Sequence, residues 1–447
     1  MMDFETVAAL GFLVLLTILV YFKRKNLDTK QVIPYILYFS MYRTKLGLRL
    51  MDSMAKKYRK LVLYIGYFGV LIGFLGMILI SYGLLSNIYV LFTRPEAQPG
   101  VGLVLPIKAK GIFFVPFFYW IISIFVIAVV HEFSHGLIAR ANNMKVKSSG
   151  FAFMGTGFRV SGLAIALFSL YFKMAHNQLF DFSDFDFLDY ASPDFWLIAG
   201  IILVGLSYIR GLSVVSYIPI IPAAFVEPDE KELRKRPHKE QLSMFAAGPM
   251  ANILTAFACF AIFLLIGSAA VADGVRVTDY VKSKDAFPAE KAGIKIGEVI
   301  KGIDGIETPY RDNLSTALKA KKPGEIVNVR TDSSAYQLKL AANPQNESAA
   351  YMGAYLEQNI RLKFGIGGDF FVKIIVWLSG LFYFLFILNF GIGLFNLVPI
   401  GPLDGGRMLQ LPLHRYFGKE KGSKIWAYVG MFFLVVILVN ILFAFIS

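Results

Sequence analysis

The sequence predicts a mainly α-helical polytopic membrane protein with about eight transmembrane helices and one small α+β domain outside the membrane. Of its 447 residues, 56% are hydrophobic and only 17% are charged, and the mean hydropathy is +0.59. Soluble domains usually carry about 25% charged residues. Several uncharged stretches also exceed the ~18 residues that cross a hydrocarbon layer as a helix. These observations exclude a disordered chain and argue against a wholly soluble protein.

The predicted spans are the apolar segments that lie between clusters of charge. They cover residues 7–22, 61–84, 111–135, 160–172, 195–217, 242–270, 374–398 and 425–446. The spans at 160–172 and 195–217 are the shortest pair, and either could instead be a re-entrant or interfacial segment.

Charge indicates how the chain is oriented. Lys and Arg total 45 against 31 acids, a net charge of +14. In a soluble chain this excess would suggest nucleic-acid binding, but cytoplasmic loops of membrane proteins collect Lys and Arg. We therefore expect a lipid bilayer around the chain and no nucleic-acid partner. Basic clusters at 23–60, 140–147, 231–239 and 407–424 are placed in the cytoplasm, and the acidic loop 181–194 lies opposite.

Residues 1–110 are predicted to be a two-span anchor with a basic interfacial stretch and a loop. Within it, residues 31–60 mix apolar side chains with Lys and Arg. This mixture is typical of a basic amphipathic stretch on an anionic membrane surface. An ordinary cytoplasmic helical linker is the alternative.

A hydrophilic insert at 271–358 falls on the extracytoplasmic side. Its pattern predicts strands at 274–280, 299–303, 326–331 and 336–340, and helices at 288–292 and 313–320. The run PAEKAGIKIGEVIKGIDG resembles the core of a PDZ domain. Such domains bind extended peptide segments or termini by adding a strand to a sheet edge. The alternative is a small structural domain that binds nothing.

The most specific motif is HEFSH, residues 131–135, at the end of an uncharged run. On a helix, His131 and His135 project from the same face, so both imidazoles can reach one metal. Glu132 lies beside them, where it can accept a proton from an attacking water. Ionisable groups are expensive inside a membrane and usually functional. The alternative is a pair of histidines satisfied within the core.

A catalytic zinc site needs a third N or O ligand and an open position. An HExxHxxGxxH pattern fails, because Ile138 and Ala141 occupy the expected Gly and His positions. The next Glu along the chain is Glu227, in a hydrophilic loop. Asp404 ends the uncharged stretch 374–403 and is the candidate. A plain turn at 402–406 is the alternative reading of this segment.

HEFSH, a distant LDG and a PDZ-like insert together resemble the site-2 protease family of intramembrane zinc metalloproteases. The resemblance covers roughly residues 111–156 and 219–410, with HEFSH and LDG specific as a pair. PAAFVEPDE (222–230), AAGPMAN (246–252) and NLVPIGPLDGG (396–406) are similar to further elements of that family.

The resemblance implies one Zn²⁺ per chain, held by His131, His135 and Asp404, with Glu132 as the catalytic proton acceptor. Asn252 and Asn396 are candidates for hydrogen-bonding the substrate backbone or orienting a ligand. Helix–helix hydrogen bonding within the bundle is the alternative for both. In this family a membrane-embedded β-like segment pairs with the unwound substrate, and 146–158 is the expected counterpart.

The expected function is regulated intramembrane proteolysis, the hydrolysis of peptide bonds within or near the transmembrane helix of membrane-protein substrates. The catalytic core would consist of residues 111–270, carrying HEFSH, and 359–447, carrying LDG, in a multi-pass protein of the cell membrane. The active site would face the cytoplasm and the PDZ-like domain the other side. An ion-coupled transporter and a PDZ-bearing membrane scaffold are the alternatives, although the halves show no internal repeat.

Overall fold

The computed structural model describes residues 4–34, 36–94, 97–106, 110–175, 192–208, 217–282, 286–363 and 369–446. The chain forms two compact units. The first consists of residues 1–260 and 383–447, and the second of residues 261–382.

Six helices of the described chain are long and apolar enough to cross a membrane. They are α1 (Phe4–Lys23), α3 (Arg59–Thr93), α4 (Phe117–Ala141), α8 (His238–Ala269), α11 (Asp369–Phe395) and α12 (Asp404–Ile446). Each contains one of the predicted spans or most of it. The start of α4 differs from the prediction, because 112–114 form a strand, β4 (Ile112–Phe114), that pairs with β3 (Leu103–Leu105). Helix α12 also begins much earlier than 425 and changes direction at Gly418, whose φ is 74°.

The predicted count of eight spans is not confirmed. The two remaining apolar segments form α5 (Phe158–Ala175) and α6 (Pro193–Leu206), whose apolar parts are shorter. The 14 residues of α6 extend about 21 Å at ~1.5 Å per residue, less than the hydrocarbon layer of ~30 Å. Residues 209–216, which the prediction placed in a span, lie outside the described residues, and β6 (Tyr217–Pro228) begins directly after them.

Helices α5 and α6 pack against each other as a hairpin. Their backbones approach at Gly162 and Gly200, where a β-carbon on either would lie 2.5–2.6 Å from the carbonyl oxygen of the other. Lys173 of α5 and Asp194 of α6 form a 2.6 Å ion pair, and both side chains are 7% exposed. The acidic residues predicted between these helices, at 181–189, lie outside the described residues.

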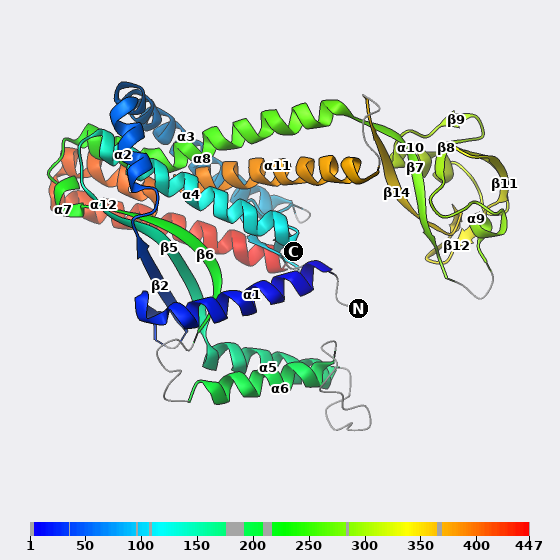
Figure 1. The fold of residues 1–447 in the computed structure, drawn as a ribbon, viewed down its shortest axis with the longest axis horizontal. Coiled ribbons are helices and arrows are strands. Elements are labelled where there is room, and N and C mark those ends of the chain that lie inside the picture. Colours follow the sequence, from blue (N-terminus) through cyan, green and yellow to red (C-terminus); the bar gives the residue numbers. More distant parts are fainter. Residues whose placement is uncertain are drawn as a thin grey trace. The chain divides into compact units, whose positions relative to one another are not determined.

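A four-stranded antiparallel sheet completes the first unit, in the order β1-β2-β5-β6. Strands β5 (Val146–Gly157) and β6 run side by side, and α5 follows β5 directly (Figure 1). The β-like segment predicted at 146–158 is thus confirmed as a strand. Both edges of β5 are already paired, with β2 and β6. The expectation that this strand pairs with substrate is therefore wrong.

The prediction for residues 31–60 is wrong in its first half. Instead of a basic amphipathic stretch on the membrane surface or a helical linker, the chain forms the hairpin β1 (Leu27–Ile33) and β2 (Leu37–Thr44), which follows the short helix η1 (Arg24–Asn26). Only α2 (Leu48–Lys57) is the expected amphipathic helix, with Leu48, Met51 and Ala55 buried. The apolar side chains of β2 are partly buried because β2 pairs with β5, in the register Leu37 to Thr156.

The second unit contains the predicted α+β domain. The helices are α9 (Pro288–Lys291) and α10 (Arg311–Lys319), and the first strands are β7 (Ala270–Tyr280), β8 (Val299–Ile303), β9 (Ile306–Glu307), β10 (Ile326–Thr331) and β11 (Ala335–Lys339). These confirm the predicted elements to within a few residues. Strands β12 (Ala341–Asn343), β13 (Asn346–Tyr351) and β14 (Ala354–Leu362) were not predicted. The main sheet has the order β11-β10-β8-β7-β14, with β9 on β8.

Candidate metal centre

Two imidazoles meet on one face of α4. His131 and His135 are four residues apart, so the helical period places them one turn from each other on the same side. Their Nε2 atoms lie 3.1 Å apart, and their rings meet edge to face with centroids 4.7 Å apart. The two side chains are 12% and 11% exposed. Both Nε2 atoms can therefore approach one ion in a largely enclosed site.

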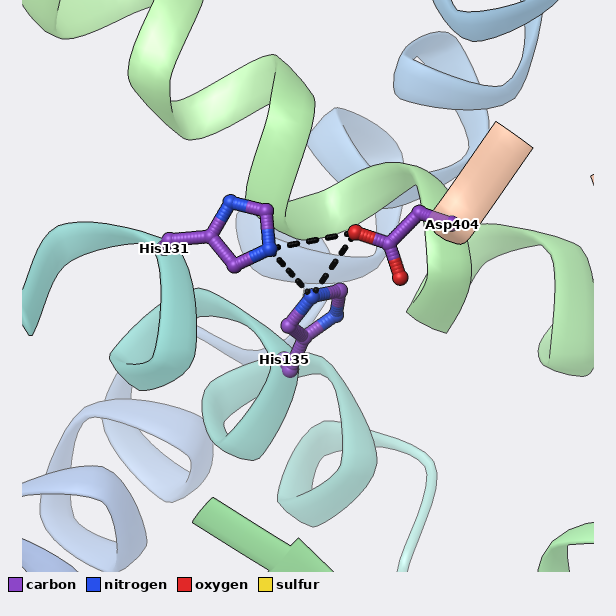
Figure 2. A group of neighbouring side chains, drawn as sticks. All are labelled: His131, His135 and Asp404. Atoms are coloured by element: carbon purple, nitrogen blue, oxygen red, sulfur yellow. Dashed lines mark hydrogen bonds and ion pairs between the residues drawn. The ribbon is translucent and has the colours of Figure 1, made fainter. Parts of the chain in front are cut away.

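Asp404 supplies the third group, from the first turn of α12 (Figure 2). Its Oδ2 lies 3.1 Å from Nε2 of His131 and 3.3 Å from Nε2 of His135. Ligands at about 2.05 Å from a tetrahedral zinc are themselves separated by about 3.3 Å. The three donor atoms thus have the spacing of three corners of a small tetrahedral site. Among the described residues, no other group of three His, Cys, Asp or Glu side chains has a comparable arrangement.

The two glycines after Asp404, in the first turn of α12, let this helix pack closely against the turn that precedes it. The amide of Gly405 donates a 2.8 Å hydrogen bond to the carbonyl of Asn396. A β-carbon on Gly405 or Gly406 would lie only 2.1 Å from the carbonyl oxygen of Leu397 or Ile400, respectively. The LDGG sequence therefore folds back on the preceding residues, which directs Asp404 toward α4.

The outward nitrogens of both imidazoles have partners on α8. Nδ1 of His135 lies 2.7 Å from the carbonyl oxygen of Met244. Since a carbonyl only accepts, Nδ1 carries the hydrogen and Nε2 is left as a lone-pair donor for a metal. Nδ1 of His131 lies 3.2 Å from the side-chain amide of Asn252, which is completely buried.

The buried amide of Asn252 has one unpaired oxygen, Oδ1. If Nε2 of His131 binds a metal, its Nδ1 carries the hydrogen and requires an acceptor. A 180° rotation of the Asn252 amide brings Oδ1 to that hydrogen and pairs it. The donor set thus fits a metal that binds both histidines through Nε2.

Glu132 points to the sheet rather than into the triangle of donors. Its Oε2 accepts a 3.0 Å hydrogen bond from the backbone amide of Val226 in β6. Strand β6 ends the sheet order, so this amide lies on the edge that β5 does not use. Glu132 of α4, which the sequence predicts to be the proton acceptor, therefore lies next to the free edge of β6.

Asn396, the other predicted substrate-binding residue, directly follows α11 and begins the turn that leads to α12. Its backbone carbonyl accepts from Gly405, while its side chain makes no hydrogen bond to the described part of the chain. Of the remaining histidines, His414 contacts the Ser423 hydroxyl at 3.0 Å, and His176 lies outside the described residues.

Charged residues beyond the donors form a network across the sheet near Glu227. The hydroxyl of Ser148 donates a 2.7 Å hydrogen bond to Glu227, and Arg43 lies 3.4 Å from the same oxygen. The Ser148 hydrogen bond, aided by Arg43, lowers the pKa of Glu227 from its usual 4.5. Arg43 also pairs with Asp28 at 2.8 Å and lowers the pKa of that carboxyl. The network connects β1, β2, β5 and β6.

The sequence did not reveal the Met244 carbonyl or Gly248, both of α8. A β-carbon on Gly248 would lie 2.5–2.6 Å from both imidazoles, so only glycine lets α8 approach them. The available signal was the AAGPMAN run, which contains Gly248 and Asn252.

A family comparison agrees with this geometry. The family model of Peptidase family M50 matches residues 119–437, which include every residue of the donor triangle. This match covers more than half of the chain, which therefore belongs to Peptidase family M50. The resemblance to site-2 proteases inferred from HEFSH and LDG is confirmed.

Individual relatives match shorter regions. The zinc metalloprotease RasP of Shouchella clausii (strain KSM-K16) is 22% identical over 240 residues, 44% of this chain and 56% of RasP. The zinc metalloprotease MJ0392 of Methanocaldococcus jannaschii is 46% identical over 50 residues, 11% of this chain and 15% of that relative. The chain thus spans about half the length of RasP. A crystal structure of the PDZ domain of the SdrC-like protein from Listeria monocytogenes is 25% identical, covers 19% of this chain and 87% of that domain, and has a TM-score of 0.17.

Proposed function

We propose that this chain is a zinc-dependent intramembrane protease of the site-2 type, which cleaves membrane-protein substrates within or near a transmembrane helix. The observation that carries the proposal is the triangle of His131 Nε2, His135 Nε2 and Asp404 Oδ2, with sides of 3.1–3.3 Å. Zinc metalloprotease names among the relatives support the choice of metal.

His131, His135 and Asp404 would hold one zinc ion. Zinc bound there supplies a Lewis acid that polarises the scissile carbonyl and makes water more acidic. The Met244 carbonyl keeps His135 in the tautomer that presents Nε2, and Asn252 does the same for His131 when its amide is rotated so that Oδ1 faces Nδ1. These contacts prepare the site without a rearrangement of α4.

Glu132 is the general base in this proposal. The Val226 amide holds its Oε2, which leaves Oε1 to accept a proton from the attacking water and deliver it to the leaving amine. Because the same amide belongs to β6, the carboxylate is held in place relative to any segment that lies along that strand.

The edge of β6 is the proposed binding site for the unwound substrate. A transmembrane helix satisfies its own backbone, and an opened segment in lipid loses several kcal/mol per unpaired group. In an antiparallel sheet, alternate residues direct their backbone groups to the same edge. Since Val226 faces away from β5, Ala224 faces the same edge and could pair with the substrate. The Asn396 amide is the candidate for a further hydrogen bond to the substrate backbone.

The second unit is the proposed peptide-binding module, on the extracytoplasmic side. Strand β14 ends its sheet, and α10 packs against it. An extended substrate segment or terminus could add to β14 beside α10. Deletion of residues 271–358 should change the cleavage of a full-length substrate, whereas unchanged cleavage would contradict this role.

The decisive experiment is to measure zinc in the purified protein and in three variants. Wild type should hold one zinc per chain, and His135→Ala and Asp404→Asn should lose it. Glu132→Gln should keep the metal and lose proteolysis. An ion-coupled transporter or a scaffold would hold no stoichiometric zinc in any form, and full proteolysis by Glu132→Gln would remove the general-base assignment.

A further inference from the structure

Helix α3 lies outside the region that matches Peptidase family M50. It nevertheless packs against α4, α8 and α12, the helices that carry His131, His135 and Asp404 or support their side chains. Its buried face carries four glycines, Gly66, Gly69, Gly73 and Gly76. Their spacing of three and four residues places them on one side of the helix. Glycines on such a face let neighbouring helices approach closely inside a membrane.

Two of these glycines contact the residues on either side of Asp404. A β-carbon on Gly73 would lie 2.6 Å from the Met408 Cε atom, and one on Gly76 would lie 2.5 Å from the Leu397 Cδ1 atom. Met408 follows Asp404 by one helical turn, and Leu397 belongs to the turn that precedes Asp404. Both side chains are completely buried, and protein interiors are close-packed, so a displacement of either is passed on to its neighbours.

The other two glycines contact the helices that carry and support the histidines. A β-carbon on Gly66 would lie 2.7 Å from the Ile138 Cδ1 atom, one turn beyond His135 on α4. One on Gly69 would lie 3.4 Å from Met250 of α8, which is two residues from Gly248. The glycine face therefore packs against α4, α8 and α12 close to His135, Gly248 and Asp404.

We infer that the glycine face of α3, defined by Gly66, Gly69, Gly73 and Gly76, is a positioning surface for the metal ligands. It sets the separation between Asp404 on one side and the two histidines on the other. Close-packed interiors transmit displacement, so a side chain on this face moves Met408 or Leu397 and the adjacent carboxylate with them. The inference rests on the proposed zinc site and assigns α3 a role beyond anchoring.

The test compares zinc affinity in full-length protein in detergent, by competition with a chelator. Gly73→Leu and Gly76→Leu should weaken zinc binding by about 10-fold or more, the size of effect seen when support of metal ligands is lost. The d–d absorption of Co²⁺ bound in place of zinc should also shift, because the ligand geometry changes. Gly83→Leu is the matched control on the same helix, since a β-carbon there meets nothing within 4 Å, and it should match wild type.

A volume exchange separates positioning from general damage. In Gly73→Leu with Met408→Ala, the added side chain occupies the space that Met408 vacates, so zinc affinity and the Co²⁺ spectrum should return toward wild type. If the leucine variants do not fold, the same measurements are made on Gly73→Ala and Gly76→Ala, for which we expect a smaller loss of zinc affinity. Two results would overturn the inference. In the first, both alanine variants have the zinc affinity and Co²⁺ spectrum of wild type. In the second, a glycine variant lowers the unfolding temperature of the metal-free protein but leaves its zinc affinity unchanged. Absence of zinc from wild type would instead refute the proposed function.

Discussion

Gly248 of α8 lies against the Nε2 edge of His135, where a β-carbon would come 2.5 Å from Nε2. The same β-carbon would lie 2.6 Å from Nε2 of His131. These are the two nitrogens that point to Asp404. The backbone of α8 thus closes one side of the site, and only the missing side chain leaves room for the donor atoms to converge.

Gly248→Ala should therefore weaken zinc binding. The added methyl must displace at least one imidazole, and we expect a loss of about 10-fold or more in affinity, equivalent to about 1.4 kcal/mol. Chelator competition on the purified protein measures it. Gly267→Ala, on the same helix with nothing within 4 Å of its β-carbon, is the control. Equal affinities for the two variants would show that the close approach is irrelevant to the metal.

Asn252→Ala distinguishes the two roles considered for this residue. If the amide orients His131, the variant should lose about 10–100-fold in zinc affinity, as is typical for partners of metal-bound histidines. Asn252→Asp keeps an acceptor for Nδ1 and should retain most of the affinity. Unchanged zinc binding with a raised KM for substrate would instead assign Asn252 to substrate binding.

The buried pair of Lys173 and Asp194 should behave non-additively. Removing one partner leaves an unpaired buried charge, so Lys173→Met or Asp194→Leu alone should destabilise the α5–α6 hairpin by about 3–5 kcal/mol. The double variant should cost much less, because no charge remains unpaired. Limited proteolysis between the two helices, as a function of denaturant, reports the stability of the hairpin. Additive effects would mean that the 2.6 Å contact contributes no coupling.

Glu227 should make the sheet sensitive to acid. The Ser148 hydrogen bond holds the pKa of this carboxyl below its usual 4.5. A lowered folded-state pKa adds stability that is fully present above the unfolded-state pKa and is lost as the pH falls through the folded-state value. Wild type should thus unfold at a higher temperature than Glu227→Gln at pH 7, and the difference should shrink as the pH falls below the ordinary Glu pKa of about 4.3. A difference that stays constant across this range would contradict the role of ionised Glu227.

Local patterns were sufficient for elements whose structure depends on neighbours in the chain. The strands at 299–303 and 326–331 coincide with β8 and β10, since alternation and turn residues act over a few positions. The hairpin of β1 and β2 was missed for the opposite reason. Its apolar and basic side chains suit an amphipathic helix as well, and only pairing with β5, more than 100 residues away, selects the strand.

The sequence by itself determined that two imidazoles face one point, because four residues on a helix are one turn. It also determined which long apolar segments form the main spans, and that a small hydrophilic unit lies between the spans at 242–270 and 374–398. Only the tertiary structure decided that Asp404 reaches His131 and His135 within 3.3 Å, that α8 supplies Met244 and Gly248, and that the edge of β6 lies beside Glu132. Those relationships join segments far apart in the chain, and close packing and hydrogen bonding between helices establish them, which no local periodicity encodes.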